Sequence, residues 1–134
     1  STTARRIEIQ QDVAKRLAEH TGQVLTSTVE RLENILARLE SRIAKIKANG
    51  VDTSLPESFV VETKTHLSEA RRSIEIFASI DLTGDKAKEN FQKIRETAAQ
   101  VKVYLKEAQE SLKKAVRALK PEGKVETTTT TEAQ

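Results

Sequence analysis

The residues best suited to chemistry are two histidines and the carboxylates around one of them. Glu62, His66 and Glu69 recur at steps of four and three, which places them on one face of a helix. An imidazole and two carboxylates could hold a divalent cation loosely, but a solvated helix face has the same pattern, and we adopt that interpretation. His20 lies on another segment beside an apolar stripe. We interpret it as an ordinary interface residue, not as a metal ligand or pH switch.

Motifs of enzymes and cofactor proteins are absent from the sequence. It contains no cysteine, no Glu-x-x-His pair, no nucleophile elbow and no glycine-rich phosphate loop. We therefore predict a protein that is not an enzyme, holds no metal or cofactor and acts on no small-molecule substrate.

Two apolar seams indicate long helices that pack against partner helices. Apolar residues at alternating steps of four and three keep one stripe facing a neighbour, as in bundles and coiled coils. Only four glycines, two prolines and four aromatic residues occur in 134, so an all-α chain is predicted. The seams are Leu25, Val29, Leu32, Leu36, Leu39, Ile43 and Ile46, and then Ala87, Phe91, Ile94, Ala98, Val101, Leu105, Ala108, Leu112, Ala115 and Leu119.

Cap and turn signals divide the chain into three helices. The first is expected from about Thr3 to the Asn49-Gly50 pair, the second from a capping box that starts at Ser54, and the third from a cap at Thr83. Short connections force antiparallel neighbours, which gives an elongated up-down-up three-helix bundle. Poor helix formers around Gly22 leave two possibilities: a continuous or bent first helix, or a break that creates a fourth short helix.

Unequal helix lengths predict overhangs at both ends of the bundle. We divide the chain into an overhanging segment at 1–24, a bundle core at 25–120 and a tail at 121–134. Within the core, residues 108–120 are expected to extend past the second helix. Apolar stripes of this size rarely stay bare, so the overhangs could join copies head to tail as a homo-oligomer, or the first segment could fold back within one molecule. The assembly residues are Ile7, Ile9, Val13, Leu17, Leu112, Val116 and Leu119.

The tail has no helical pattern and is rich in threonine. An extended segment of this kind could add as a strand to a neighbouring copy, or it could be a disordered or glycosylated linker. The residues concerned are Val125, Thr127, Thr128, Thr129, Thr130 and Thr131.

Basic residues form a stripe near the end of the third helix. Cations there complement the helix dipole, and an alternative is contact with anionic glycans, lipid head groups or nucleic acid. An acidic middle segment between two basic ones argues against a dedicated nucleic-acid surface, and the net charge is only +3. The stripe consists of Lys106, Lys113, Lys114, Arg117 and Lys120.

Two features bear on location. No apolar run is long enough to span a bilayer, so membrane insertion is not expected. The chain begins at Ser1 without an initiator methionine, as expected after removal of a signal peptide or a tag, and this favours export.

The sequence also resembles uncharacterised small exported helical-bundle proteins of candidate-phylum, small-genome bacteria, over residues 27–120. The resemblance is carried by RLENI (31–35), LESRIAKI (39–46), GVDTS (50–54) and DKAKENF (85–91). It implies export and a helical hairpin-like repeat, and it brings no functional residues. Spectrin-like repeats share the architecture, but their buried tryptophan is missing here.

Together these observations predict an exported, non-enzymatic structural protein at the cell surface or outside the cell, with the periplasm as an alternative. Its copies are expected to assemble head to tail into a surface filament or layer. The alternative is a monomeric helical binding module that recognises a protein or an anionic surface.

Overall fold

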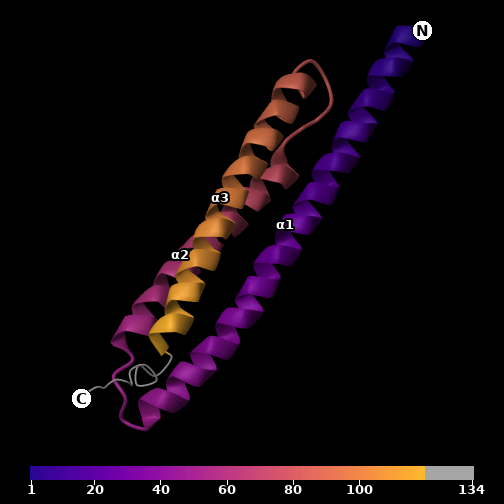
Figure 1. Cartoon of the computed structure of the whole chain (residues 1–134). Helices are drawn as coiled ribbons and strands as arrows, with labels where there is room; N and C mark the ends of the chain where they lie inside the picture. The colour runs from indigo at the N-terminus through magenta and orange to yellow at the C-terminus, as the bar shows by residue number, and fades with distance from the viewer. Residues whose placement is uncertain (120–134) are drawn as a thin grey trace.

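The computed structural model describes residues 1–119, which form three helices: α1 (Thr2–Ala48), α2 (Ser54–Ser79) and α3 (Ala87–Leu119). They run up, down and up as an elongated bundle, and no strand occurs in this part of the chain (Figure 1). The predicted all-α three-helix bundle is confirmed. Lys120 and the predicted tail lie outside the described residues.

The first helix, α1, continues unbroken for 47 residues. The alternative of a break near Gly22 is therefore wrong. Leu25 and Val29 are buried directly after the weak segment, and the Thr28 hydroxyl donates to the Val24 carbonyl oxygen at 3.1 Å inside the helix. Burial of the apolar face outweighs the poor helix propensity of the polar residues.

The turn between α1 and α2 follows the predicted signals, with a shift of one residue in the cap. Gly50 has φ of +88°, the left-handed conformation expected after a helix end. The N-cap of α2 is Thr53, not Ser54, and the Thr53 hydroxyl donates to Glu57. The Asp52 carboxylate accepts from the backbone N–H and the hydroxyl of Ser54, at 2.9 and 2.6 Å, and these bonds lower the pKa of Asp52.

The connection between α2 and α3 occupies residues 80–86 and is longer than predicted. The carboxylate of Asp81 accepts from the backbone N–H and the hydroxyl of Thr83, at 2.9 and 2.6 Å, which lowers the pKa of Asp81. Gly84 has φ of +77°. Thr83 therefore belongs to a turn and does not cap α3, which begins at Ala87.

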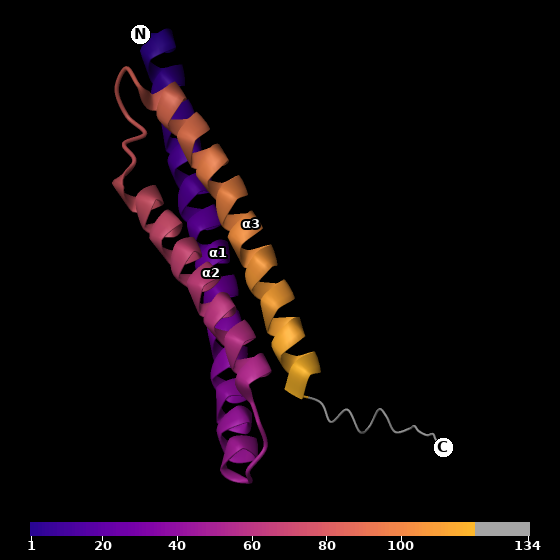
Figure 2. The ribbon, with the colours of Figure 1, turned by 90° about the vertical axis from the view of Figure 1, so that its left-hand side faces the viewer.

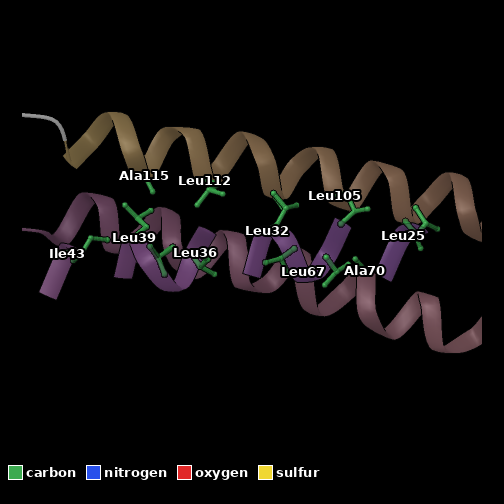
Figure 3. Packing of buried hydrophobic residues seen from close by; sticks show 14 of the residues in the cluster. Leu25, Leu32, Leu36, Leu39, Ile43, Leu67, Ala70, Leu105, Leu112 and Ala115 are labelled. Atoms are coloured by element: carbon green, nitrogen blue, oxygen red, sulfur yellow. The ribbon is translucent and has the colours of Figure 1, made fainter. Parts of the chain in front are cut away.

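One continuous core joins the three helices, and the predicted seams supply most of it (Figure 3). The α2–α3 hairpin is packed more closely than either helix is packed against α1. The side chains of Val29 and Val101 have no exposed surface. Within this core the hydroxyls of Thr63 and Ser111 lie 2.7 Å apart and link α2 to α3. The buried apolar residues of the cluster are Leu25, Val29, Leu32, Leu36, Leu39, Ile43, Val60, Leu67, Ala70, Ala98, Val101, Leu105, Ala108, Leu112 and Ala115.

Three ion pairs fix the register between α1 and α2. Their members recur every seven residues on both helices, in antiparallel order. The Arg71 guanidinium donates two hydrogen bonds to the Glu33 carboxylate, at 2.8 and 2.6 Å, and these bonds lower the pKa of Glu33. The other pairs are Lys64 with Glu40 at 2.7 Å and Lys47 with Glu57 at 3.4 Å.

Replacement of Gly22 by alanine should stabilise the protein. A Cβ at this position would meet no atom within 4 Å, and alanine favours the helix by about 0.5–1 kcal/mol over glycine. Urea unfolding followed by circular dichroism measures the change. The matched variant Gly50→Ala should destabilise, because φ there is +88°. A destabilised Gly22→Ala would contradict the continuous helix.

Replacement of Glu33 by glutamine should cost up to about 1 kcal/mol at neutral pH. The pKa of Glu33 is lower in the folded chain than its ordinary value of 4.5, so the stabilisation is complete above that value and disappears as the pH falls through the lower folded value. Urea unfolding at neutral pH and well below pH 4.5 should therefore show a difference that vanishes in acid. The control, Glu62→Gln, should change stability by less than about 0.5 kcal/mol at either pH.

Candidate interaction surface

The N-terminal half of α1 carries an exposed apolar surface, which we call the α1 stripe: Ile9, Val13, Leu17 and Val24. Each of these side chains is between 47% and 56% exposed. Their spacing of four, four and seven residues places them along one side of the helix. Val24 was not among the predicted assembly residues, although its heptad step from Leu17 is visible in the sequence.

The stripe is bare because the rest of the bundle touches α1 on another side. Ala18 is buried against Leu82 and Ile94, so contact begins seven residues before the predicted boundary at residue 25. Ile7 lies five helical turns before Leu25 and so points to the bundle side, yet it is 48% exposed. The first turns of α1 extend past the connection between α2 and α3 (Figures 1 and 2).

The predicted overhang at residues 108–120 is wrong for the residues that the structure describes. Leu112 is buried in the core of its own chain (Figure 3). Val116 and Leu119 are half-buried against the same cluster. The long connection before Ala87 takes up the length difference, so the last turns of α3 lie beside the first turns of α2. Leu112 therefore offers no exposed surface to a second copy.

The predicted basic residues near the end of α3 differ in their surroundings. Lys106 and Arg117 are exposed. Lys113 lies 4.0 Å from the Glu110 carboxylate, and the Lys114 ammonium lies 6.0 Å from the centre of the Phe59 ring. Lys120 and the predicted tail residues, 125 and 127–131, lie outside the described part of the chain.

The two histidines do not form a metal site with the residues that the structure places. Nδ1 of His66 lies 3.4 Å from Oε1 of Glu69 and 3.5 Å from Oε1 of Glu107. This nitrogen is buried and has no hydrogen-bond partner. Glu62 is exposed and His20 is exposed on α1. Glu107 belongs to α3, and nothing in the sequence of α2 could have identified it. Within residues 1–119 no cluster of histidine and carboxylate side chains could hold a metal ion.

A cleft of about 1120 Å³ separates the N-terminal half of α1 from the end of α2 and the following turn. Its walls combine apolar side chains such as Phe77 and Ile80 with carboxylates such as Glu8, Asp12 and Asp81. None of the buried polar side chains of the described residues, which are Thr53, Thr63 and Ser111, lines it. The cleft thus lacks the convergent buried polar groups of a small-molecule site.

Comparisons of the chain with protein-family models, curated proteins and solved structures gave no significant match. Among residues 1–119 no helix has the length and apolar character needed to cross a membrane.

Leu112 and Leu17 provide a direct test of these placements. Leu112→Ala should destabilise the fold by about 2–5 kcal/mol, because it removes buried apolar contacts. Leu17→Ala, its matched variant on the α1 stripe, should change stability by less than about 0.5 kcal/mol. Urea unfolding at low protein concentration measures both. Equal effects of the two substitutions would contradict the packing described for α3.

Proposed function

We propose that the protein is a non-enzymatic structural subunit whose copies associate through the α1 stripe. The observation that supports this proposal is the row of exposed large apolar side chains on a helix whose bundle side is already occupied at Ala18. Rows of exposed large apolar side chains of this kind are characteristic of interaction sites.

The size of the stripe predicts a reversible association. Complete burial of a large apolar side chain contributes roughly 1.5–3 kcal/mol, and the four side chains are already about half-buried. Two facing stripes would then contribute roughly 6–12 kcal/mol, against a cost of association of about 4–15 kcal/mol. The favourable and unfavourable contributions are similar, so association should depend strongly on concentration.

Pairing of one stripe with the same stripe of a second copy needs only one surface and gives a symmetric dimer. An antiparallel arrangement keeps Arg5 and Arg6 of the two copies apart, whereas a parallel one would bring four like charges together. The head-to-tail mode expected from the sequence would instead need a receptor at the α3 end, where Leu112 is buried. Growth into a filament or layer would need a second contact, which we assign to the threonine-rich tail.

We place this subunit outside the cytoplasm, at the cell surface or in the extracellular space. The resemblance of residues 27–120 to small exported helical proteins supports this part of the proposal. The alternative function is a monomeric helical module that binds a protein or an anionic surface.

Sedimentation velocity over a range of concentrations tests the assembly proposal. The chain should form dimers or larger species as the concentration rises, and the variant Val13→Ser with Leu17→Ser should remain monomeric because serine removes the apolar contact. Circular dichroism should show unchanged helicity, since both side chains are about half-exposed in the monomer.

The matched control is Val61→Ser with Val103→Ser, which alters two exposed valines on α2 and α3. It should associate like the unmodified chain. A sharp species of 14.9 kDa at the highest concentration would overturn the proposal and favour the monomeric module.

A further inference from the structure

The two sides of the apolar seam of α1, which we call its flanks, differ in charge. A seven-residue repeat makes this difference visible. The repeat reads Arg31-Leu32-Glu33, Arg38-Leu39-Glu40 and Lys45-Ile46-Lys47. Successive helical residues are about 100° apart, so the residues before and after each apolar member lie on opposite flanks. The members that follow, Glu33, Glu40 and Lys47, are paired with α2. The residues that precede the apolar members, Arg31, Arg38 and Lys45, therefore lie on the flank turned away from α2.

That second flank of α1 is basic along its C-terminal half. Arg42 precedes the buried Ile43 and so joins the same flank. All four side chains are exposed: Arg31, Arg38, Arg42 and Lys45.

On α3 the residues that precede a core residue face α2, whereas on α1 the residues that follow one do. Glu107 lies beside His66, and Ser111 contacts Thr63, so the residues that precede a core residue face α2. The residues that follow a core residue lie on the flank turned away from α2. Four of these are basic and exposed: Arg95, Lys102, Lys106 and Lys113.

Because α1 and α3 are neighbours that run in the same direction, their flanks turned away from α2 lie on the same side of the bundle (Figure 1). We call this surface, with its eight basic side chains, the basic face. Three ion pairs join α1 to α2, but none joins α1 to α3 in the part of the chain that the structure describes. The basic face thus collects positive charge without internal compensation, apart from Glu110 at 4.0 Å from Lys113.

We propose that the basic face is a docking surface for an anionic lipid bilayer. Long basic side chains on two neighbouring helices can reach a layer of phosphate groups together. The contact is peripheral and needs no inserted helix. It uses none of the residues of the α1 stripe, so it stands independently of the assembly proposal.

Nucleic acid fits this surface less well. Single strands are bound through exposed aromatic side chains, but Phe59, Phe77, Phe91 and Tyr104 are all half-buried against the core. Duplex readers insert a helix into a groove, whereas these basic residues lie along a broad flank shared by two helices.

Co-sedimentation of the full chain with vesicles tests the proposal. The protein should bind vesicles of equal parts phosphatidylcholine and phosphatidylglycerol at low salt and dissociate from them at high salt. It should not bind vesicles of phosphatidylcholine alone. The variant Arg38→Gln, Arg42→Gln, Lys106→Gln, Lys113→Gln should weaken binding by about fivefold for each lost charge, or about six-hundredfold in total.

The matched control removes the same charge elsewhere: Lys15→Gln, Arg72→Gln, Lys86→Gln, Lys93→Gln. These side chains are exposed and lie off the basic face. The control should keep most of the binding, and thermal unfolding should show that both variants fold. Equal losses in the two variants, or no binding by the unmodified chain, would overturn the proposal. Tighter binding to duplex DNA than to the vesicles at the same salt would assign the face to nucleic acid instead.

Discussion

Burial of the apolar seam of α1 between α2 and α3 is the constraint on which the other features depend. Where the seam is apolar and partnered, from Leu25 to Ile43, α1 forms part of the core. Before Ala18 the same helix faces the end of α2 and the following turn only across a cleft, and its large apolar residues remain exposed. Both the core and the exposed stripe thus follow from which side of α1 the hairpin covers, since Val24 is exposed although Ala18 and Leu25 are buried. No break in α1 is needed to explain why some of its apolar residues are buried and others exposed.

Polar contacts then select one arrangement among those that would bury the seams. The ion pairs of Glu33, Glu40 and Lys47 hold α1 and α2 in a single register, although each exposed pair contributes little energy. The hydroxyls of Thr63 and Ser111 do the same between α2 and α3, where an unpaired hydroxyl in the core would be costly. The flanks of α1 and α3 that are turned away from α2 are both basic, and no ion pair joins these two helices within the described residues. Apolar packing therefore determines how α1 lies against α3.

The core could be predicted from the sequence because heptad spacing alone decides which side of a helix is apolar. The position of Leu112 could not, because its burial depends on the length of the turn at residues 80–86. The approach of Glu107 to His66 depends on the register of the α2–α3 hairpin, which no local pattern contains. The basic residues of α3 were recognised in part, but the contribution of Arg38 and Arg42 required knowledge of which flank of α1 faces α2.

The unbroken course of α1 has a mechanical consequence. From Ala18 to Ser1 the helix extends about 25 Å without a partner on the stripe side. A helix is stiff over this distance, so the segment keeps the direction set by the packed part of α1, which begins where Ala18 contacts Leu82 and Ile94. A small change in the tilt of α1 against the hairpin therefore displaces the first turns of the helix more than its packed part. A partner bound to the stripe would accordingly be held at an angle set by the packing of the whole bundle.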